Sequence, residues 1–201
     1  MLCVSVPLFA QPGSVLINEI MYDDTATTDV EWVELYNPTP FPRTLSNWVL
    51  TDGNVWPPPS TEGAIIIPPG TFLPPFGYLV ISKQPIAEFP VVVCNEVDPS
   101  WALNNGGDNL ALFDGNSPTA QLIDGSLITM FPDLVVANAG NSVEKRIQNM
   151  QWTDDPLVWK ECTQVFSPVG RFRNCTPGQP NSPDAPIQCG VIEETAESNN
   201  T

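Results

Sequence analysis

The sequence predicts an all-β fold, a sandwich or a barrel, and three observations carry this prediction. Short segments rich in Val, Ile and Thr recur along the 201 residues and are separated by turn residues. No window shows the sustained 3.6-residue apolar spacing of an amphipathic helix. The 23 prolines fix φ and remove backbone donors, so they are expected at strand ends and in loops. We therefore expect about 8 to 10 short antiparallel strands with long Pro-rich loops.

The strands expected in the first half of the chain are each bounded by turn residues. The second has Val33 and Leu35 on one face and is ended by Pro38. In the third, Trp48 and Leu50 share a face. Three consecutive prolines then form a loop before the fourth. These strands are expected at 15–21, 30–37, 47–52, 64–67 and 77–82.

The second half of the chain contains one clear hairpin. Leu110 and Leu112 alternate with their neighbours, and the Asp114-Gly115-Asn116 turn leads into the next strand. Beyond this hairpin the sequence is less regular. The strands expected here lie at 91–94, 109–114, 120–124 and 142–147.

Composition divides the chain into three parts. Residues 1–10 (MLCVSVPLFA) are apolar and resemble the end of a secretory signal peptide, although a buried N-terminal strand is the alternative. Residues 11–181 form the expected β-sandwich domain, and the polar residues 182–201 form a tail or linker. We therefore expect a secreted or cell-surface protein. No apolar stretch approaches the roughly 20 residues of a transmembrane helix.

The charge of the chain is strongly unbalanced. Seven Lys and Arg residues face 23 Asp and Glu residues, a net charge of −16. A phosphate backbone or an anionic lipid surface is repelled by such a protein. The basic pairs Lys145-Arg146 and Arg171 with Arg173 are too small to change this. Nucleic acid is therefore excluded as a partner.

Histidine is absent, which removes the Ser-His-Asp, Cys-His and zinc-hydrolase chemistries. Carboxylate chemistry remains. Glu31 and Glu34 lie three apart on a strand and face opposite sides, so only Glu19 could approach one of them across strands. A glycosidase pair would need a separation of about 5–10 Å around a sugar cleft. The alternative is that Glu19 caps loop amides or pairs with an arginine such as Arg43.

Four cysteines remain if residues 1–10, which contain Cys3, are removed, and an even number fits an oxidising compartment. A Cys162–Cys175 disulfide is the first expectation, because these residues bracket a Pro- and Gly-containing loop. Cys94–Cys189 then follows by elimination. The rival pairing is Cys175–Cys189 with Cys94–Cys162.

Two sets of residues suggest ligands. Clustered carboxylates in the acidic loop at residues 23–31 offer oxygen ligands to Ca²⁺, without the EF-hand spacing. Trp56 and Trp101 stand beside prolines in loops and are candidates for stacking against sugars. The calcium candidates are Asp23, Asp24, Asp29 and Glu31. Apart from Ca²⁺, the sequence indicates no cofactor.

Seven motifs follow one another along the chain: VLINEIMY (15–22), EWVELYNP (31–38), LSNWVLTDG (45–53), IIIPPGTFLPPFGYLVIS (65–82), LNNGGDNLALFDG (103–115), SVEKRI (142–147) and TPGQPN (176–181). This ordered set resembles the lamin tail domain, in the form found in secreted bacterial proteins. The resemblance spans about residues 15–181 and implies a non-catalytic, immunoglobulin-like β-sandwich. The chain departs from the family pattern by insertions at 84–102 and 152–175 and by its cysteines.

These observations favour a non-catalytic, secreted or cell-surface interaction or structural module, with a protein partner or self-association within an extracellular assembly. The alternative is a carbohydrate- or Ca²⁺-dependent accessory domain of a larger secreted enzyme. A third hypothesis, an autonomous hydrolase, requires two carboxylates that converge in a cleft.

Overall fold

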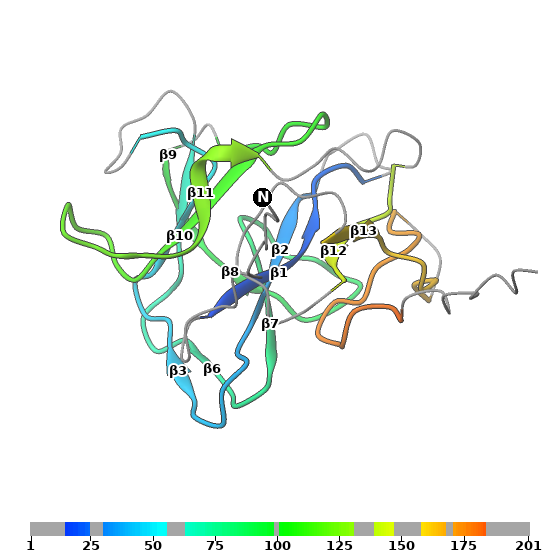
Figure 1. Cartoon of the computed structure of the whole chain (residues 1–201), viewed down its shortest axis with the longest axis horizontal. Helices are drawn as coiled ribbons and strands as arrows, with labels where there is room; N and C mark the ends of the chain where they lie inside the picture. Colours follow the sequence, from blue (N-terminus) through cyan, green and yellow to red (C-terminus); the bar gives the residue numbers. More distant parts are fainter. Residues whose placement is uncertain are drawn as a thin grey trace, which may run out of the picture.

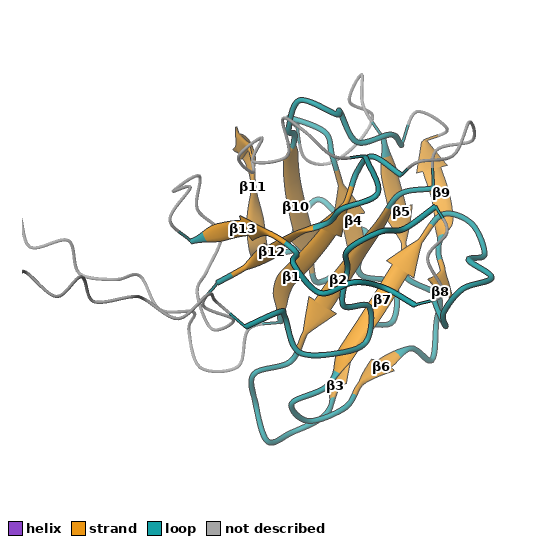
Figure 2. Cartoon of the chain, turned by 90° about the vertical axis from the view of Figure 1, so that its right-hand side faces the viewer, coloured by secondary structure: helices purple, strands orange, loops and turns teal. Residues whose placement is uncertain are grey.

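The computed structural model describes residues 15–24, 30–55, 63–98, 101–130, 139–146, 158–167 and 171–183. This part of the chain contains strands and loops and no helix (Figure 2), which confirms the all-β prediction. It therefore contains no helix long and apolar enough to cross a membrane. The strands are β1 (Leu16–Met21), β2 (Trp32–Tyr36), β3 (Arg43–Thr44), β4 (Val49–Thr51), β5 (Ala64–Ile66), β6 (Phe72–Leu73), β7 (Tyr78–Ser82), β8 (Val92–Val93), β9 (Asn95–Asp98), β10 (Asn109–Phe113), β11 (Leu122–Met130), β12 (Val143–Lys145) and β13 (Trp159–Glu161).

The strands form two main sheets and a small third one (Figure 1). One sheet has the order β13-β12-β1-β2-β7-β8, and the other has the order β11-β10-β4-β5-β9. Strands β3 and β6 pair separately, at one end of the molecule in Figures 1 and 2. Pairing is antiparallel except between β7 and β8. Strands β3, β6, β9 and β13 are additional to those expected; β3 and β6 have two residues each and β13 has three, too few to show alternation.

The main core lies between the two larger sheets. Val33 and Leu35 of β2 point into it, as their alternation predicts, and meet Leu50, Leu110 and Leu112 of the facing sheet. A buried ion pair also joins the sheets: Lys145 Nζ of β12 lies 3.1 Å from Asp124 Oδ2 of β11. The fold is therefore a two-sheet sandwich with a charged pair inside it.

The six-stranded sheet is covered on its outer face as well. Trp32 of β2 points away from the main core and makes edge contacts with Phe89 and Phe172, with ring centroids 5.6 and 6.3 Å apart. Cys175 belongs to the same second apolar cluster. Because the segment around residues 171–183 lies over this face, the outward side chains of β1 and β2 are as buried as the inward ones.

The predicted hairpin is confirmed by the antiparallel pairing of β10 with β11. Gly125 pairs with Ala111 between the two register shifts of this hairpin and has φ of 89°. A Cβ at this position would lie 2.0 Å from the carbonyl oxygen of Leu110, so glycine is required there.

Candidate functional site

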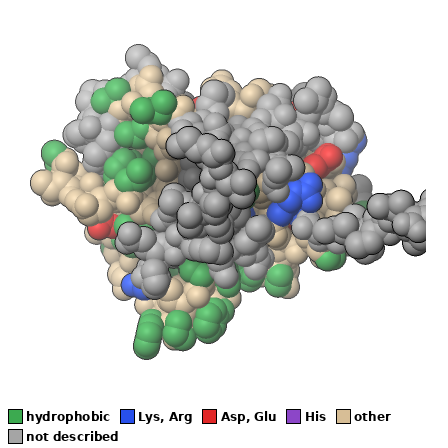
Figure 3. Space-filling view, viewed as in Figure 1, with side chains coloured by type: hydrophobic (Ala, Val, Ile, Leu, Met, Phe, Trp, Pro, Cys, Tyr) green, Lys and Arg blue, Asp and Glu red, His purple; other side chains and the backbone are tan. Residues whose placement is uncertain are grey.

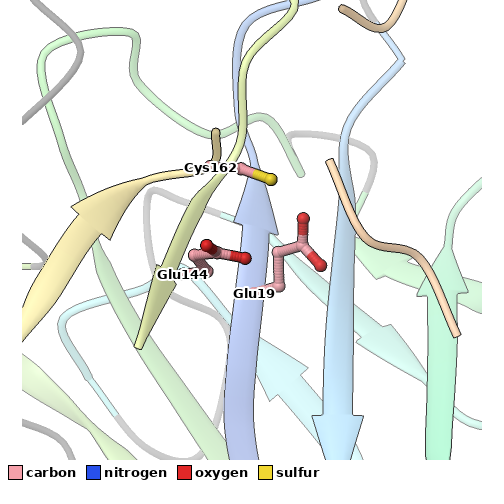
Figure 4. A group of neighbouring side chains, drawn as sticks. All are labelled: Glu19, Glu144 and Cys162. Carbon is pink, nitrogen blue, oxygen red and sulfur yellow. The ribbon is translucent and has the colours of Figure 1, made fainter. Parts of the chain in front are cut away.

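Three buried glutamates form a row across the outer face of the six-stranded sheet. Glu19 on β1 lies directly opposite Glu144 on β12 and Glu34 on β2. A bulge between Ile17 and Glu19 turns Asn18 and Glu19 to the same outer face. Each glutamate is fully buried. We call Glu19, Glu34 and Glu144 the carboxylate row; Figure 4 shows two of its members beside Cys162.

The C-terminal segment 174–183 closes over this row and supplies most of its hydrogen-bond donors. Thr176 N donates to Glu19 Oε1 at 2.8 Å, and Thr176 Oγ1 donates to Glu19 Oε2 at 2.8 Å. Gly178 N donates to Glu34 Oε2 at 2.6 Å. Ser182 donates to Glu144 through both its amide and its hydroxyl. The segment is thus held to the sheet by carboxylates.

Further donors come from the sheet and its neighbours. The Ser142 hydroxyl donates to Glu19 Oε1, Asn18 Nδ2 donates to Glu34 Oε1 at 2.8 Å, and Lys160 Nζ lies 3.5 Å from Glu144 Oε1. Every carboxylate oxygen of the row therefore accepts at least one hydrogen bond from the protein itself.

Burial dominates the electrostatics of the row. It raises the pKa of Glu19 to about 7, against the opposing hydrogen bonds from Ser142 and Thr176. Burial also raises the pKa of Glu34 well above its ordinary value, and the charge of Glu19 adds to this effect. The row carries less negative charge at neutral pH than three exposed carboxylates would.

The row is arranged to hold a chain segment. Glu19 caps loop amides, which was one of the two alternatives for it, and it does not pair with Arg43. Cys162 Sγ and carboxylate oxygens of Glu19 and Glu144 lie within 4.8 Å of one another, a spacing that suits a metal ion. These oxygens already accept hydrogen bonds from protein donors, however, and a metal ion or a sugar would have to displace those donors.

A second feature lies at the end of the molecule that carries β3 and β6. Phe41, Phe72 and Phe76 expose 68%, 63% and 56% of their surfaces. We call these three residues the aromatic tip. Apolar side chains gather at this end of the molecule in Figure 3. Monomeric proteins rarely leave several large apolar side chains exposed together unless the surface has a function.

The loops of the aromatic tip are fixed by one buried side chain, Asn37. Its Nδ2 donates to the carbonyl oxygens of Phe41 at 2.7 Å and Pro74 at 2.9 Å, and its Oδ1 accepts from the amide and the hydroxyl of Thr39. Phe76 N donates to Thr39 O at 3.1 Å. The three phenyl rings are therefore presented on well-tied backbone.

Backbone conformation also holds the rings in place. Phe76 has φ of 51°, a left-handed conformation that is rare for a bulky residue. At Gly77 an added Cβ would lie 2.8 Å from the Pro74 ring, so only glycine fits. On β6, Phe72 points outward while its neighbour Leu73 is fully buried and anchors the strand.

Comparison with known proteins decides the family. Residues 9–130, more than half of the chain, match the Lamin Tail Domain family. The chain belongs to the lamin tail domain family. No curated protein and no solved structure matches it. The matched range of this lamin tail domain includes the whole aromatic tip, together with Glu19 and Glu34, and ends before Glu144.

The cysteines of this lamin tail domain differ from the expectation. Cys94, Cys162 and Cys175 are free, buried thiols, so the structure contains neither a Cys162–Cys175 nor a Cys94–Cys162 bond; Cys189 lies outside the described residues. Cys175 packs in the second apolar cluster, whereas Cys162 faces the carboxylate row. Burial raises the pKa of all three thiols, that of Cys94 to about 12, which keeps them protonated.

Among the described residues, the calcium candidates Asp23, Asp24 and Glu31 make separate contacts. Asp24 Oδ2 accepts from Val30 N at 3.2 Å and lies 3.6 Å from Arg171 Nη1. Glu31 Oε1 instead accepts from Leu103 N at 2.7 Å. Among the described residues Asp23, Asp24 and Glu31 form no group with metal-ligand spacing, and Asp29 lies outside them.

The tryptophan candidates give no sugar platform in the described chain. Trp101 is only 2% exposed and belongs to the main core, so the expectation that it is exposed is wrong. A proline neighbour marks a loop but does not set the direction of the ring. Trp56 lies outside the described residues.

Sequence reasoning missed the aromatic tip. The signal was present, because Phe41 stands between Pro40 and Pro42, and Phe76 follows Pro74-Pro75. Neighbouring prolines restrict the backbone of a tight turn, and this restriction disfavours burial of the phenylalanine side chain in the core.

Proposed function

We propose that this lamin tail domain is a non-catalytic interaction module of a secreted or cell-surface protein, and that it binds through the aromatic tip. The observation that carries the proposal is the exposure of three phenyl rings on rigid loops. Phe41, Phe72 and Phe76 each expose more than half of their surface.

The rigidity of the tip favours binding. A partner that covers a side chain already fixed in place loses little conformational entropy, and each phenyl ring then contributes roughly 1–2 kcal/mol from its newly buried surface. The chain uses a fully buried Asn37 and a left-handed Phe76 to keep this geometry. A strained backbone that keeps apolar side chains exposed is expected where that surface binds a partner.

Two observations support a non-catalytic role. The chain has no histidine. The oxygens of Glu19, Glu34 and Glu144 all accept hydrogen bonds from protein donors, which leaves the row to hold segment 174–183. The signal-peptide-like residues 1–10 support secretion, and a tip that projects from one end suits a subunit of an extracellular assembly.

Site-specific photo-crosslinking tests this proposal. The photoreactive residue p-benzoylphenylalanine is placed at position 41, 72 or 76 of the full chain. The purified protein is then incubated with cells of the organism whose genome encodes it. The matched control places the same residue at Ile128, which is 87% exposed on β11. We expect crosslinked products from the tip positions well above the control. Equal yields at the tip and at Ile128 would overturn the proposal.

A further inference from the structure

The aromatic tip has the chemistry of a membrane-inserting element, and we infer that its partner is the surface of a phospholipid bilayer. This inference rests on the proposed function, because it names the partner of the same surface. Four features of the tip and its surroundings carry it: shape, satisfied backbone, a polar margin and the absence of acidic residues.

The first feature is the position of the tip. Strands β3 and β6 and their turns form one end of the molecule in both cartoon views, and apolar side chains cover this end in Figure 3. A projecting apolar end requires a matching hollow in a protein partner. The acyl region of a bilayer needs no preformed cavity, because lipid chains rearrange around an inserted apolar group.

The second feature is the internal satisfaction of the backbone. The Phe41 carbonyl accepts from Asn37, and the Pro74 carbonyl accepts from Asn37 and Gly77. Phe76 N donates to Thr39 O. The neighbouring prolines have no N–H to leave unpaired. Backbone that enters lipid must have its polar groups hydrogen-bonded within the protein. The Phe41 and Pro74 carbonyls and the Phe76 amide meet this requirement.

The third feature is the margin between the tip and the body of the domain. Tyr36 of β2 and Tyr78 of β7 lie opposite each other, half-buried, with stacked rings 4.9 Å apart. Tyrosine is enriched at the level of lipid headgroups. Arg43 of β3 is half-buried and makes no ion pair with any described residue. A lipid phosphate is the acceptor that a guanidinium binds well.

The fourth feature is charge. The segments 35–51 and 63–87, which build the tip and its margin, contain none of the 23 acidic residues. The acidic residues therefore lie elsewhere in a chain of net charge −16. A neutral, zwitterionic surface can approach this end, whereas an anionic surface is repelled by the rest of the protein.

Vesicle flotation tests the inference. The full chain is mixed with phosphatidylcholine vesicles and compared with the tip variant Phe41→Ser, Phe72→Ser, Phe76→Ser. The matched control variant carries Leu122→Ser, Ile128→Ser and Val165→Ser, three apolar residues that are 51%, 87% and 64% exposed elsewhere. We expect the tip variant to lose at least about 30-fold in partitioning and the control to stay within about threefold of the wild type.

Three further arms sharpen the result. Binding of the wild type should survive 0.5 M NaCl, because apolar insertion is not screened. It should weaken when phosphatidylglycerol replaces part of the phosphatidylcholine. The single variant Phe72→Ser should lose part of the binding; because this ring is 63% exposed, the substitution is compatible with the fold, which circular dichroism checks.

The outcomes separate the inference from the proposed function. If the wild type does not float, or if the tip and control variants float equally, a bilayer is not the partner. Crosslinks from positions 41, 72 and 76 to a protein would then leave the proposed function standing. Absence of both flotation and tip-specific crosslinks would overturn both.

Discussion

At the scale of single residues, Asn37 has the largest effect on the geometry of the tip. Replacing it with Ala leaves the carbonyl oxygens of Phe41 and Pro74 without the amide that now bonds them. We expect Asn37→Ala to lower the unfolding free energy by about 1–3 kcal/mol in urea titrations and to weaken binding by the tip. Asn116→Ala, at an exposed turn, is the control. Equal stability of the two variants would show that Asn37 does not organise the tip.

Glu19 gives a prediction about pH. Its pKa is raised from 4.5 to about 7 in the folded protein, chiefly by burial. A carboxyl whose folded pKa lies above its unfolded pKa stabilises the fold fully below the unfolded value, and this contribution is lost as pH rises through the folded value. Stability should therefore fall as pH rises from about 4.5 to 7.

The variant Glu19→Gln isolates this contribution. The neutral amide cannot ionise, so we expect the slope of unfolding free energy against pH to become shallower by up to about 1.4 kcal/mol per pH unit. Glu34 also has a raised pKa, and Asp52 has a pKa of about 7, so some slope remains. Glu96→Gln, at an exposed position of β9, is the control. An unchanged slope in Glu19→Gln would contradict the assignment.

At the scale of elements, segment 174–183 is held to β1, β2 and β12 by its contacts with the carboxylate row. Thr176 Oγ1 donates to Glu19 at 2.8 Å and contacts Glu144 at 3.2 Å. Thr176→Val keeps the shape and removes the donor, and we expect a loss of about 1–3 kcal/mol in thermal or urea unfolding. Thr119→Val, at an exposed turn, should have little effect. If both variants unfold alike, the row does not hold the segment.

The ion pair between β12 and β11 links the two sheets. Lys145→Met leaves the buried Asp124 carboxylate without its cation, so we expect a loss of about 3–5 kcal/mol. Adding Asp124→Asn removes the charge and keeps an oxygen for Ile17 N, which now donates to Asp124 at 2.8 Å. The double variant should therefore be more stable than Lys145→Met alone in urea unfolding. The opposite order would contradict this interpretation.

The elements also show how far the sequence leads. Alternation correctly predicts Val33 and Leu35 in the core, because strand periodicity is a local property. It cannot predict that Glu34 is buried too, since this follows from Gly178, which is 144 positions away in the sequence. For the same reason Glu19 is recognisable as a cap only once Thr176 is placed beside it.

At the scale of the whole molecule, the chain separates two chemistries. One end carries the aromatic tip within acid-free segments, and the remaining sequence carries the 23 acidic residues. The family motifs predict the fold well because they report the strands and turns that build the sandwich. They do not report the tip, because exposure of Phe41 or Phe76 depends on how Asn37 ties two separate loops together.

The most direct test of a binding role for the tip measures how much purified protein stays bound, after washing, to cells of the organism whose genome encodes it. The wild type and the control variant with Leu122→Ser, Ile128→Ser and Val165→Ser should both be retained. The variant with Phe41→Ser, Phe72→Ser and Phe76→Ser should be recovered in the wash, while circular dichroism and thermal unfolding show that it is folded. Retention of this folded tip variant at the wild-type level would contradict the assignment of the aromatic tip as the contact surface.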